Sequence, residues 1–118
     1  SGRCNNTCLH EVSRANDTYF AAAVRLVEEV RAAYPHSQLW FTGHSLGGAI
    51  ASLMAVTFPR TAAVTFNAPG DRLYAQRLGL APERQWWALP VWNYGVSTDP
   101  VFMGACQGLA TSCYVGGY

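Results

Sequence analysis

The sequence contains no lysine and little charge of either sign. Its eight basic residues are all arginines, and with seven acidic residues they leave a formal net charge of +1. Proteins that are drawn electrostatically to nucleic acid or to an anionic membrane carry a clear positive excess, which this chain lacks. We therefore expect no nucleic-acid partner.

Long apolar runs and metal-binding patterns are missing as well. No stretch approaches the roughly 18 consecutive apolar residues that a membrane-spanning helix requires. Cys4 and Cys8 have three residues between them, which is not a usual zinc spacing, and no histidine follows at a ligand distance. The sequence thus predicts no membrane span within it, no metal site and no organic cofactor.

The composition is that of a globular unit. Half of the 118 residues are hydrophobic and 13% are charged, so the chain can bury a core. It shows no internal repeat and no low-complexity tract, and its length allows one domain at most. We interpret residues 1–118 as a fragment of a single domain.

Cysteines and glycosylation sequences indicate the compartment. The disulfide candidates are Cys4, Cys8, Cys106 and Cys113. Asn5 and Asn16 each begin an Asn-x-Thr sequence, which is the acceptor for N-glycosylation. Both features favour the secretory pathway, and four free thiols in a cytosolic protein are the alternative. The first residues are polar and show no signal peptide, so we expect any targeting segment upstream of Ser1.

Hydrophobic periodicity predicts a first helix in the N-terminal third. The helix begins at Asn16 or Asp17 and ends at Ala33 or Tyr34, before Pro35. Apolar side chains at three- and four-residue spacing form its buried face, which comprises Phe20, Ala23, Val24, Val27, Val30 and Tyr34.

Helices and strands then alternate along the chain. The predicted elements are a strand at 38–42, a buried helix at 46–58, a strand at 63–66, a short helix at 71–78 and a strand at 92–96. This alternation predicts an α/β fold in which crossover helices connect a parallel sheet. Three strands make a narrow sheet with bare edges, so we expect the sheet to be part of a larger one.

The strongest functional signal is a G-x-S-x-G sequence between a predicted strand and a predicted helix, formed by Gly43, Ser45 and Gly47. In this arrangement the serine occupies a tight, strained turn that exposes its hydroxyl at the C-terminal edge of the sheet. Gly43 and Gly47 avoid side chains that would collide with the turn and the neighbouring strand. We predict Ser45 as a nucleophile and the Leu46 N–H, at the helix N-terminus, as an oxyanion donor.

The acid that such a nucleophile requires has two candidates. The serine needs a general base, the base needs an acid to orient it, and the chain order in this fold is serine, acid, histidine. Asp99 follows the last predicted strand and can reach the same sheet edge, so it is the predicted acid. Asp71 is less favoured because a helix start explains it. The alternative for Asp99 is an Asp-Pro turn residue.

No histidine follows Asp99 in the sequence. His44 adjoins the nucleophile and should point away from its hydroxyl, while His10 and His36 lie in loop-like upstream segments. We therefore expect the general base beyond Tyr118 and a second oxyanion donor upstream of the chain. These 118 residues alone are then expected to have little or no activity.

Several longer segments share the pattern of one family. They are 41–49 (FTGHSLGGA), 64–71 (VTFNAPGD), 77–80 (RLGL), 99–104 (DPVFMG) and the terminal run 113–118 (CYVGGY). Together they resemble the class 3 (fungal) lipase family, and within it the branch that degrades autophagic bodies in the vacuole. The resemblance covers most of residues 16–118. It implies a partial α/β-hydrolase fold, with the upstream strands and the C-terminal histidine segment missing.

The resemblance also implies a function. Ser45 would be the nucleophile and Asp99 the triad acid of a lipase or phospholipase that cleaves membrane lipids through an acyl-enzyme. The domain would be glycosylated and lie in the vacuole lumen, with a membrane anchor upstream of this chain. Its partners would be lipid at a membrane surface and the other segments of the parent chain. Two alternatives remain: a soluble esterase or peptidase of the same fold, and a non-catalytic interaction domain that retains the scaffold.

Overall fold

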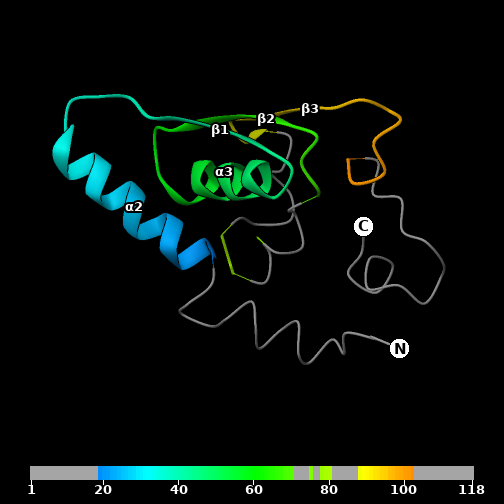
Figure 1. The fold of residues 1–118 in the computed structure, drawn as a ribbon. Helices are drawn as coiled ribbons and strands as arrows, with labels where there is room; N and C mark the ends of the chain where they lie inside the picture. Colours follow the sequence, from blue (N-terminus) through cyan, green and yellow to red (C-terminus); the bar gives the residue numbers. More distant parts are fainter. Residues whose placement is uncertain (1–18, 71–74, 76–77, 81–87, 103–118) are drawn as a thin grey trace, which may run out of the picture.

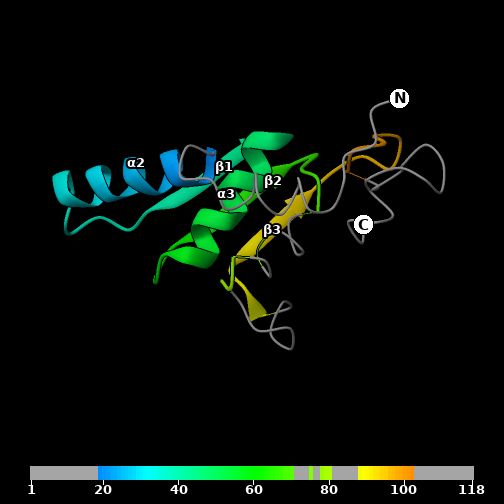
Figure 2. The same cartoon turned by 90° about the horizontal axis from the view of Figure 1, so that it is seen from below.

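The structure is a computed structural model that describes residues 19–70, 75, 78–80 and 88–102. The described elements are, in order, α2 (Tyr19–Ala33), β1 (Trp40–His44), α3 (Leu46–Thr57), β2 (Ala62–Phe66) and β3 (Val91–Tyr94). Figure 1 shows the three strands as one layer, with α3 directly against one face and α2 on the same side. Figure 2 shows the same layers from below, with the helices in front of the strands.

The three strands form a parallel sheet in the order β1-β2-β3, which confirms the predicted α/β fold. The pairing runs from Trp40 opposite Ala62 to His44 opposite Phe66, and Phe66 lies opposite Tyr94 of β3. Because the strands are parallel and in register, their carboxyl ends lie at one edge of the sheet. The loops that leave the strands there are those that form sites in open α/β sheets.

The strand boundaries differ from the predicted ones. The first strand, predicted at 38–42, lies two residues further along the chain, because pairing with β2 continues through Gly43 and His44. Because glycine is depleted in strands, strand propensity alone does not predict that the strand continues through Gly43. The strand predicted at 92–96 is β3, which already ends at Tyr94. Most of the helix predicted at 71–78 and the predicted cap at Asn16 or Asp17 lie outside the described residues.

Helix α2 buries one face against the core. Val27 is buried, and Phe20, Ala23 and Val24 pack against the same cluster at the spacing of one helix face. The prediction that Tyr34 belongs to this face is wrong, since its side chain is 62% exposed. The helix ends one residue earlier, and past its end a side chain no longer follows the helical repeat.

Helix α3 is a buried helix of mostly small residues beneath the sheet. Its buried residues are Gly48, Ala49, Ala51, Ser52, Leu53, Met54 and Ala55. At its C-terminus the Thr57 hydroxyl donates to the Leu53 carbonyl at 2.7 Å. Phe58 N–H closes the last turn on the Met54 carbonyl at 3.0 Å, and its extended backbone is that of a residue before proline. Leu53 and Met54 join the core formed with α2.

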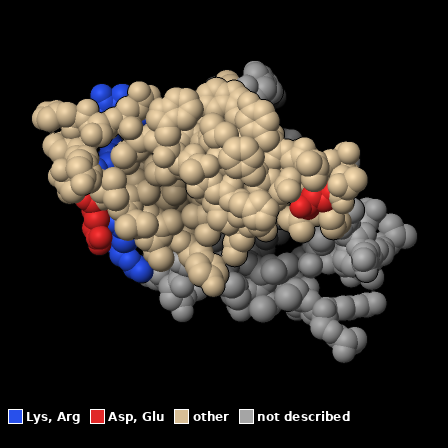
Figure 3. Space-filling view, turned by 45° about the horizontal axis from the view of Figure 1, so that its top comes forward, with Lys and Arg blue, Asp and Glu red and all other residues tan. Residues whose placement is uncertain are grey.

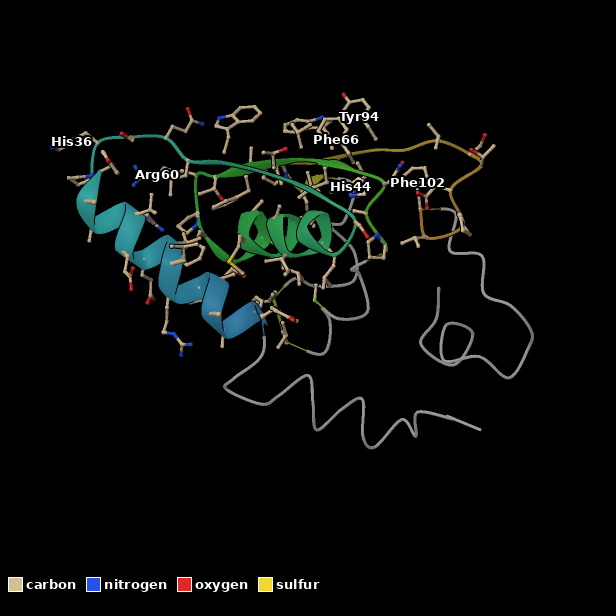
Figure 4. The ribbon with its side chains drawn as sticks, in the orientation of Figure 1. His36, His44, Arg60, Phe66, Tyr94 and Phe102 are labelled. Atoms are coloured by element: carbon tan, nitrogen blue, oxygen red, sulfur yellow. The ribbon has the colours of Figure 1, made fainter. Side chains whose placement is uncertain are left out.

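Aromatic side chains lie on the sheet face opposite α3. Trp40 and Trp92 stack with ring centroids 6.0 Å apart, and Phe66 and Tyr94 stack at 6.2 Å. All four side chains are exposed. Figure 3 shows uncharged side chains across the middle of this surface, and Figure 4 shows Phe66 and Tyr94 side by side above the sheet. Parallel sheets are usually covered on both faces, so we expect further structure over these rings.

Candidate active site

The turn between β1 and α3 holds Ser45 in a conformation that side chains rarely adopt. Ser45 has φ 53° and ψ −127°, outside the regions that L-residues favour. Its N–H donates to the Phe66 carbonyl at 3.1 Å. Its own carbonyl accepts the N–H groups of Gly48 at 2.9 Å and Ala49 at 3.2 Å. Bonds to the neighbouring strand and to the first turn of the helix therefore maintain the strained dihedral angles.

The Ser45 side chain does not cap the helix that it precedes. A serine at this position usually accepts a hydrogen bond from the first helical turn, but Ser45 makes no such bond. Leu46 is the first residue of α3, so its N–H has no partner inside the helix and lies at the positive end of the helix dipole. The turn thus places a serine hydroxyl next to helix N–H groups, as acyl transfer to serine requires.

Close approach of the backbone requires two glycines at this turn. A Cβ on Gly43 would overlap the Gly47 carbonyl and lie 2.6 Å from the Gly48 nitrogen. A Cβ on Gly48 would lie 2.8 Å from the Cβ of Ala68 and 3.3 Å from that of Thr65. The prediction that a side chain at Gly47 would collide with the turn is wrong, since a Cβ there would meet no atom of the described residues within 4 Å. Gly47 is exposed and Gly48 is buried against the sheet, which explains the difference.

Asp99 lies in the turn after β3, the strand that leaves the sheet at the same edge as β1. Its Oδ1 accepts the N–H groups of Val101 at 2.8 Å and Phe102 at 3.0 Å. Its own N–H donates to the Val96 carbonyl at 3.0 Å. These bonds are typical of an aspartate that starts a turn, and they engage one carboxylate oxygen. From the described residues, no hydrogen bond reaches Oδ2.

The ring of Phe102 closes this turn against the end of β3. A Cβ on Gly95 would overlap the Phe102 ring, so only glycine allows the ring to lie there. Figure 4 labels Phe102 beyond the strand ends, where the chain turns back on itself. The turn that carries Asp99 is therefore held by backbone hydrogen bonds and by this packing.

Asn67 links the ends of β2 and β3, and sequence patterns did not single it out. It has a positive φ of 46°. Its N–H donates to the Tyr94 carbonyl at 2.7 Å, and its Oδ1 accepts the Val96 N–H at 3.0 Å. The available signal was an asparagine directly after a strand and before Ala68-Pro69, because asparagine tolerates positive φ and bonds nearby backbone.

The two histidines that the structure describes lie in different places relative to the sheet. His36 lines an open groove of about 730 Å³ together with Arg31, Gln38 and Arg60. These residues precede β1 and β2, so the groove lies at the amino edge of the sheet, opposite Ser45. His44 pairs with Phe66 on the exposed aromatic face, as expected from the strand alternation.

The other predicted sites lie outside the described residues. They are Cys4, Cys8, Cys106, Cys113, Asn5, Asn16 and Asp71. Within the described ranges, no group of three or more His, Cys, Asp or Glu side chains is arranged to hold a metal ion. Neither α2 nor α3, the helices described, has the length and apolarity needed to cross a bilayer.

One protein family matches more than half of the chain. Residues 6–76 match the family described as Lipase (class 3), and the match includes the turn at Ser45 and the end of β2. No solved structure matches the chain significantly.

Curated relatives come from several fungi. A protein named "Putative lipase ATG15" from Candida glabrata is 43% identical over 117 residues, which are 98% of this chain and 23% of that protein. Proteins of the same name from Saccharomyces cerevisiae and Yarrowia lipolytica are 40% and 39% identical over 117 residues. Those residues are 98% of this chain in both cases, and 22% and 21% of the two proteins. The chain thus spans less than a quarter of the length of these relatives.

Proposed function

This chain belongs to the class 3 lipase family, and we propose that it supplies the nucleophile, Ser45, of a serine carboxylic-ester hydrolase with lipase activity. The observation that carries the proposal is the positive φ of Ser45 between a parallel strand and a buried helix. This is the geometry that exposes a serine hydroxyl to substrate. The name lipase borne by the fungal relatives supports the same activity.

The proposed reaction runs through an acyl-enzyme. A general base takes the Ser45 hydroxyl proton as the oxygen attacks the ester carbonyl carbon, and the leaving alcohol is protonated as the ester bond breaks. The negative charge on the carbonyl oxygen develops beside the Leu46 N–H and the positive end of α3. Water then hydrolyses the acyl-enzyme, which releases a carboxylic acid and restores the serine hydroxyl.

Asp99 is the proposed acid of this triad. Its Oδ1 is held by two N–H groups, which leaves the carboxylate oriented and Oδ2 available to a histidine. His10, His36 and His44 all precede Asp99, whereas the base follows the acid in the chain order of this fold. We propose that the base is a histidine of the parent polypeptide outside residues 1–118. The greater length of the relatives supports this division.

The proposed substrates are phospholipids and neutral lipids of membrane vesicles. The sequence resemblance to lipases that degrade autophagic bodies supports this substrate class and a vacuolar location. Four cysteines and two N-glycosylation sequences support a route through the secretory pathway. The proposed partners are therefore a lipid surface and the remaining segments of the same polypeptide.

Labelling with a fluorophosphonate probe tests the nucleophile. The full-length protein should be labelled, Ser45→Ala should not, and Ser52→Ala should be labelled like wild type because Ser52 is 1% exposed within α3. Equal labelling of wild type and Ser45→Ala would refute Ser45 as nucleophile. A folded wild-type protein without any labelling would favour the non-catalytic interaction domain.

Substrate comparison tests the lipase assignment. We expect the full-length protein to release fatty acid from phosphatidylcholine vesicles and from emulsified triacylglycerol, and to do so faster than from a soluble acetate ester. Activity restricted to the soluble ester would favour a soluble esterase, and cleavage of a peptide substrate alone would favour a peptidase. In each arm, Ser45→Ala measures the background.

A further inference from the structure

The end of β2 contacts both halves of the proposed site. The carbonyl of Phe66 accepts the N–H of Ser45, which ties the nucleophile turn to the central strand. The next residue, Asn67, donates its N–H to the Tyr94 carbonyl at the end of β3. Two consecutive residues therefore connect the turn that carries the nucleophile with the strand that leads to Asp99.

The Asn67 side chain extends this link beyond the last pair of the sheet. Strand pairing between β2 and β3 ends with Phe66 opposite Tyr94. At φ 46° the Asn67 backbone turns out of the extended conformation, and its Oδ1 takes the Val96 N–H as a strand carbonyl would. The Val96 carbonyl in turn accepts the Asp99 N–H. A continuous chain of hydrogen bonds thus leads from Asn67 to the acid.

We propose that Asn67 is a positioning residue for the triad acid, because its side-chain carbonyl holds Val96, and through Val96 the Asp99 turn, at the edge where Ser45 lies. The inference rests on the proposed role of Asp99. No other common residue meets both requirements equally well. Glycine tolerates the positive φ but offers no side-chain acceptor, while aspartate offers the acceptor but adds a negative charge near Asp99.

Replacement of Asn67 by glycine isolates the side-chain bond. Asn67→Gly keeps the backbone conformation accessible and removes only the acceptor for the Val96 N–H. Asn67→Asp is the matched control, since it keeps an acceptor oxygen at the same position. Both variants are made in the full-length protein, and kcat and KM are measured with an emulsified ester alongside the thermal unfolding midpoint.

The expected result is a loss in kcat that a structural role would not produce. A displacement of an orienting group by a fraction of an ångström to about 1 Å lowers the rate by roughly 10- to 100-fold. We expect Asn67→Gly to lose kcat in this range, with KM and the unfolding midpoint close to wild type, and Asn67→Asp to retain most of kcat. The acidic limb of the pH–rate profile should shift to lower pH in Asn67→Gly, because a displaced carboxylate no longer raises the pKa of the base.

A double-mutant cycle with Asp99→Asn separates this inference from the function on which it rests. If Asn67 acts through Asp99, Asn67→Gly adds little to the loss already caused by Asp99→Asn. Additive losses, or wild-type kcat in Asn67→Gly beside an impaired Asp99→Asn, would overturn the positioning role and leave the acid assignment intact. Full activity of Asp99→Asn would instead overturn the proposed acid itself.

Discussion

Replacement of Ser45 by glycine should stabilise the fold while it abolishes activity. Ser45 holds φ 53° and ψ −127°, and a non-glycine residue in a sparsely populated region of this kind costs about 1–3 kcal/mol. Glycine adopts a positive φ without that cost but loses about 0.5–1 kcal/mol more conformational entropy on folding than alanine. The difference predicts that Ser45→Gly is more stable than Ser45→Ala by about 1 kcal/mol at the centres of the two ranges, and by at most about 2.5 kcal/mol.

The alanine variant is the reference because both variants lack the hydroxyl. Their difference therefore reports the backbone strain and contains no contribution from the nucleophile. Urea unfolding of the two full-length variants, followed by tryptophan fluorescence, gives the free energies of unfolding for comparison. Neither variant should react with a fluorophosphonate probe.

A control pair in the same helix should show the opposite sign. Ser52 lies in the interior of α3, where glycine is less favourable than alanine by about 1 kcal/mol. We therefore expect Ser52→Gly to be less stable than Ser52→Ala. If Ser45→Ala equals or exceeds Ser45→Gly in stability while the control pair behaves as expected, the turn does not store strain, and the argument for the nucleophile geometry fails.

Four further substitutions test the packing around the site. Gly43→Ala should lower the free energy of unfolding by about 3 kcal/mol or more and abolish activity, because its Cβ would overlap backbone atoms. Gly47→Ala should leave the free energy of unfolding unchanged or slightly raised. Urea unfolding measures both effects. The free energy of unfolding of Gly48→Ala should fall between those of these two variants, since its Cβ would meet the side chains of Ala68 and Thr65. If Gly48→Ala is as stable as Gly47→Ala, the close approach of α3 to the sheet is contradicted. Ser52→Ala should raise the free energy of unfolding by about 1 kcal/mol, because the buried Ser52 hydroxyl has no hydrogen-bond partner among the described residues. A loss of stability would show that it has one.

Local patterns were sufficient for the order of the elements and for the nucleophile turn. A strand, a G-x-S-x-G sequence and a helix follow one another within 18 residues, from Trp40 to Thr57, so the conformation of Ser45 depends on its neighbours in the chain. The alternation of helices and strands then indicated a parallel sheet, which the register confirms. The first strand was misplaced by two residues because its last part, Gly43-His44, has no strand signature.

Contacts between segments that are distant in the chain could not be predicted from the sequence. The helix glycine that meets the sheet is Gly48, and only the packing of α3 against β2 distinguishes it from Gly47. The role of Asn67 depends on Val96, which is 29 residues further along the chain. The exposure of Tyr34 depends on where α2 ends and on what it packs against.

The amino-acid order of this chain thus determined its fold class, its alternating elements and the strained turn that carries the proposed nucleophile, because these arise from steric and hydrogen-bonding preferences between near neighbours. Which atoms meet at the carboxyl edge was decided only when parallel pairing brought Ser45, Asn67 and the Asp99 turn to that edge. Parallel strands are joined by long crossovers, so their ends come together only in the folded sheet. No local sequence pattern therefore predicts the hydrogen bonds that form between those ends.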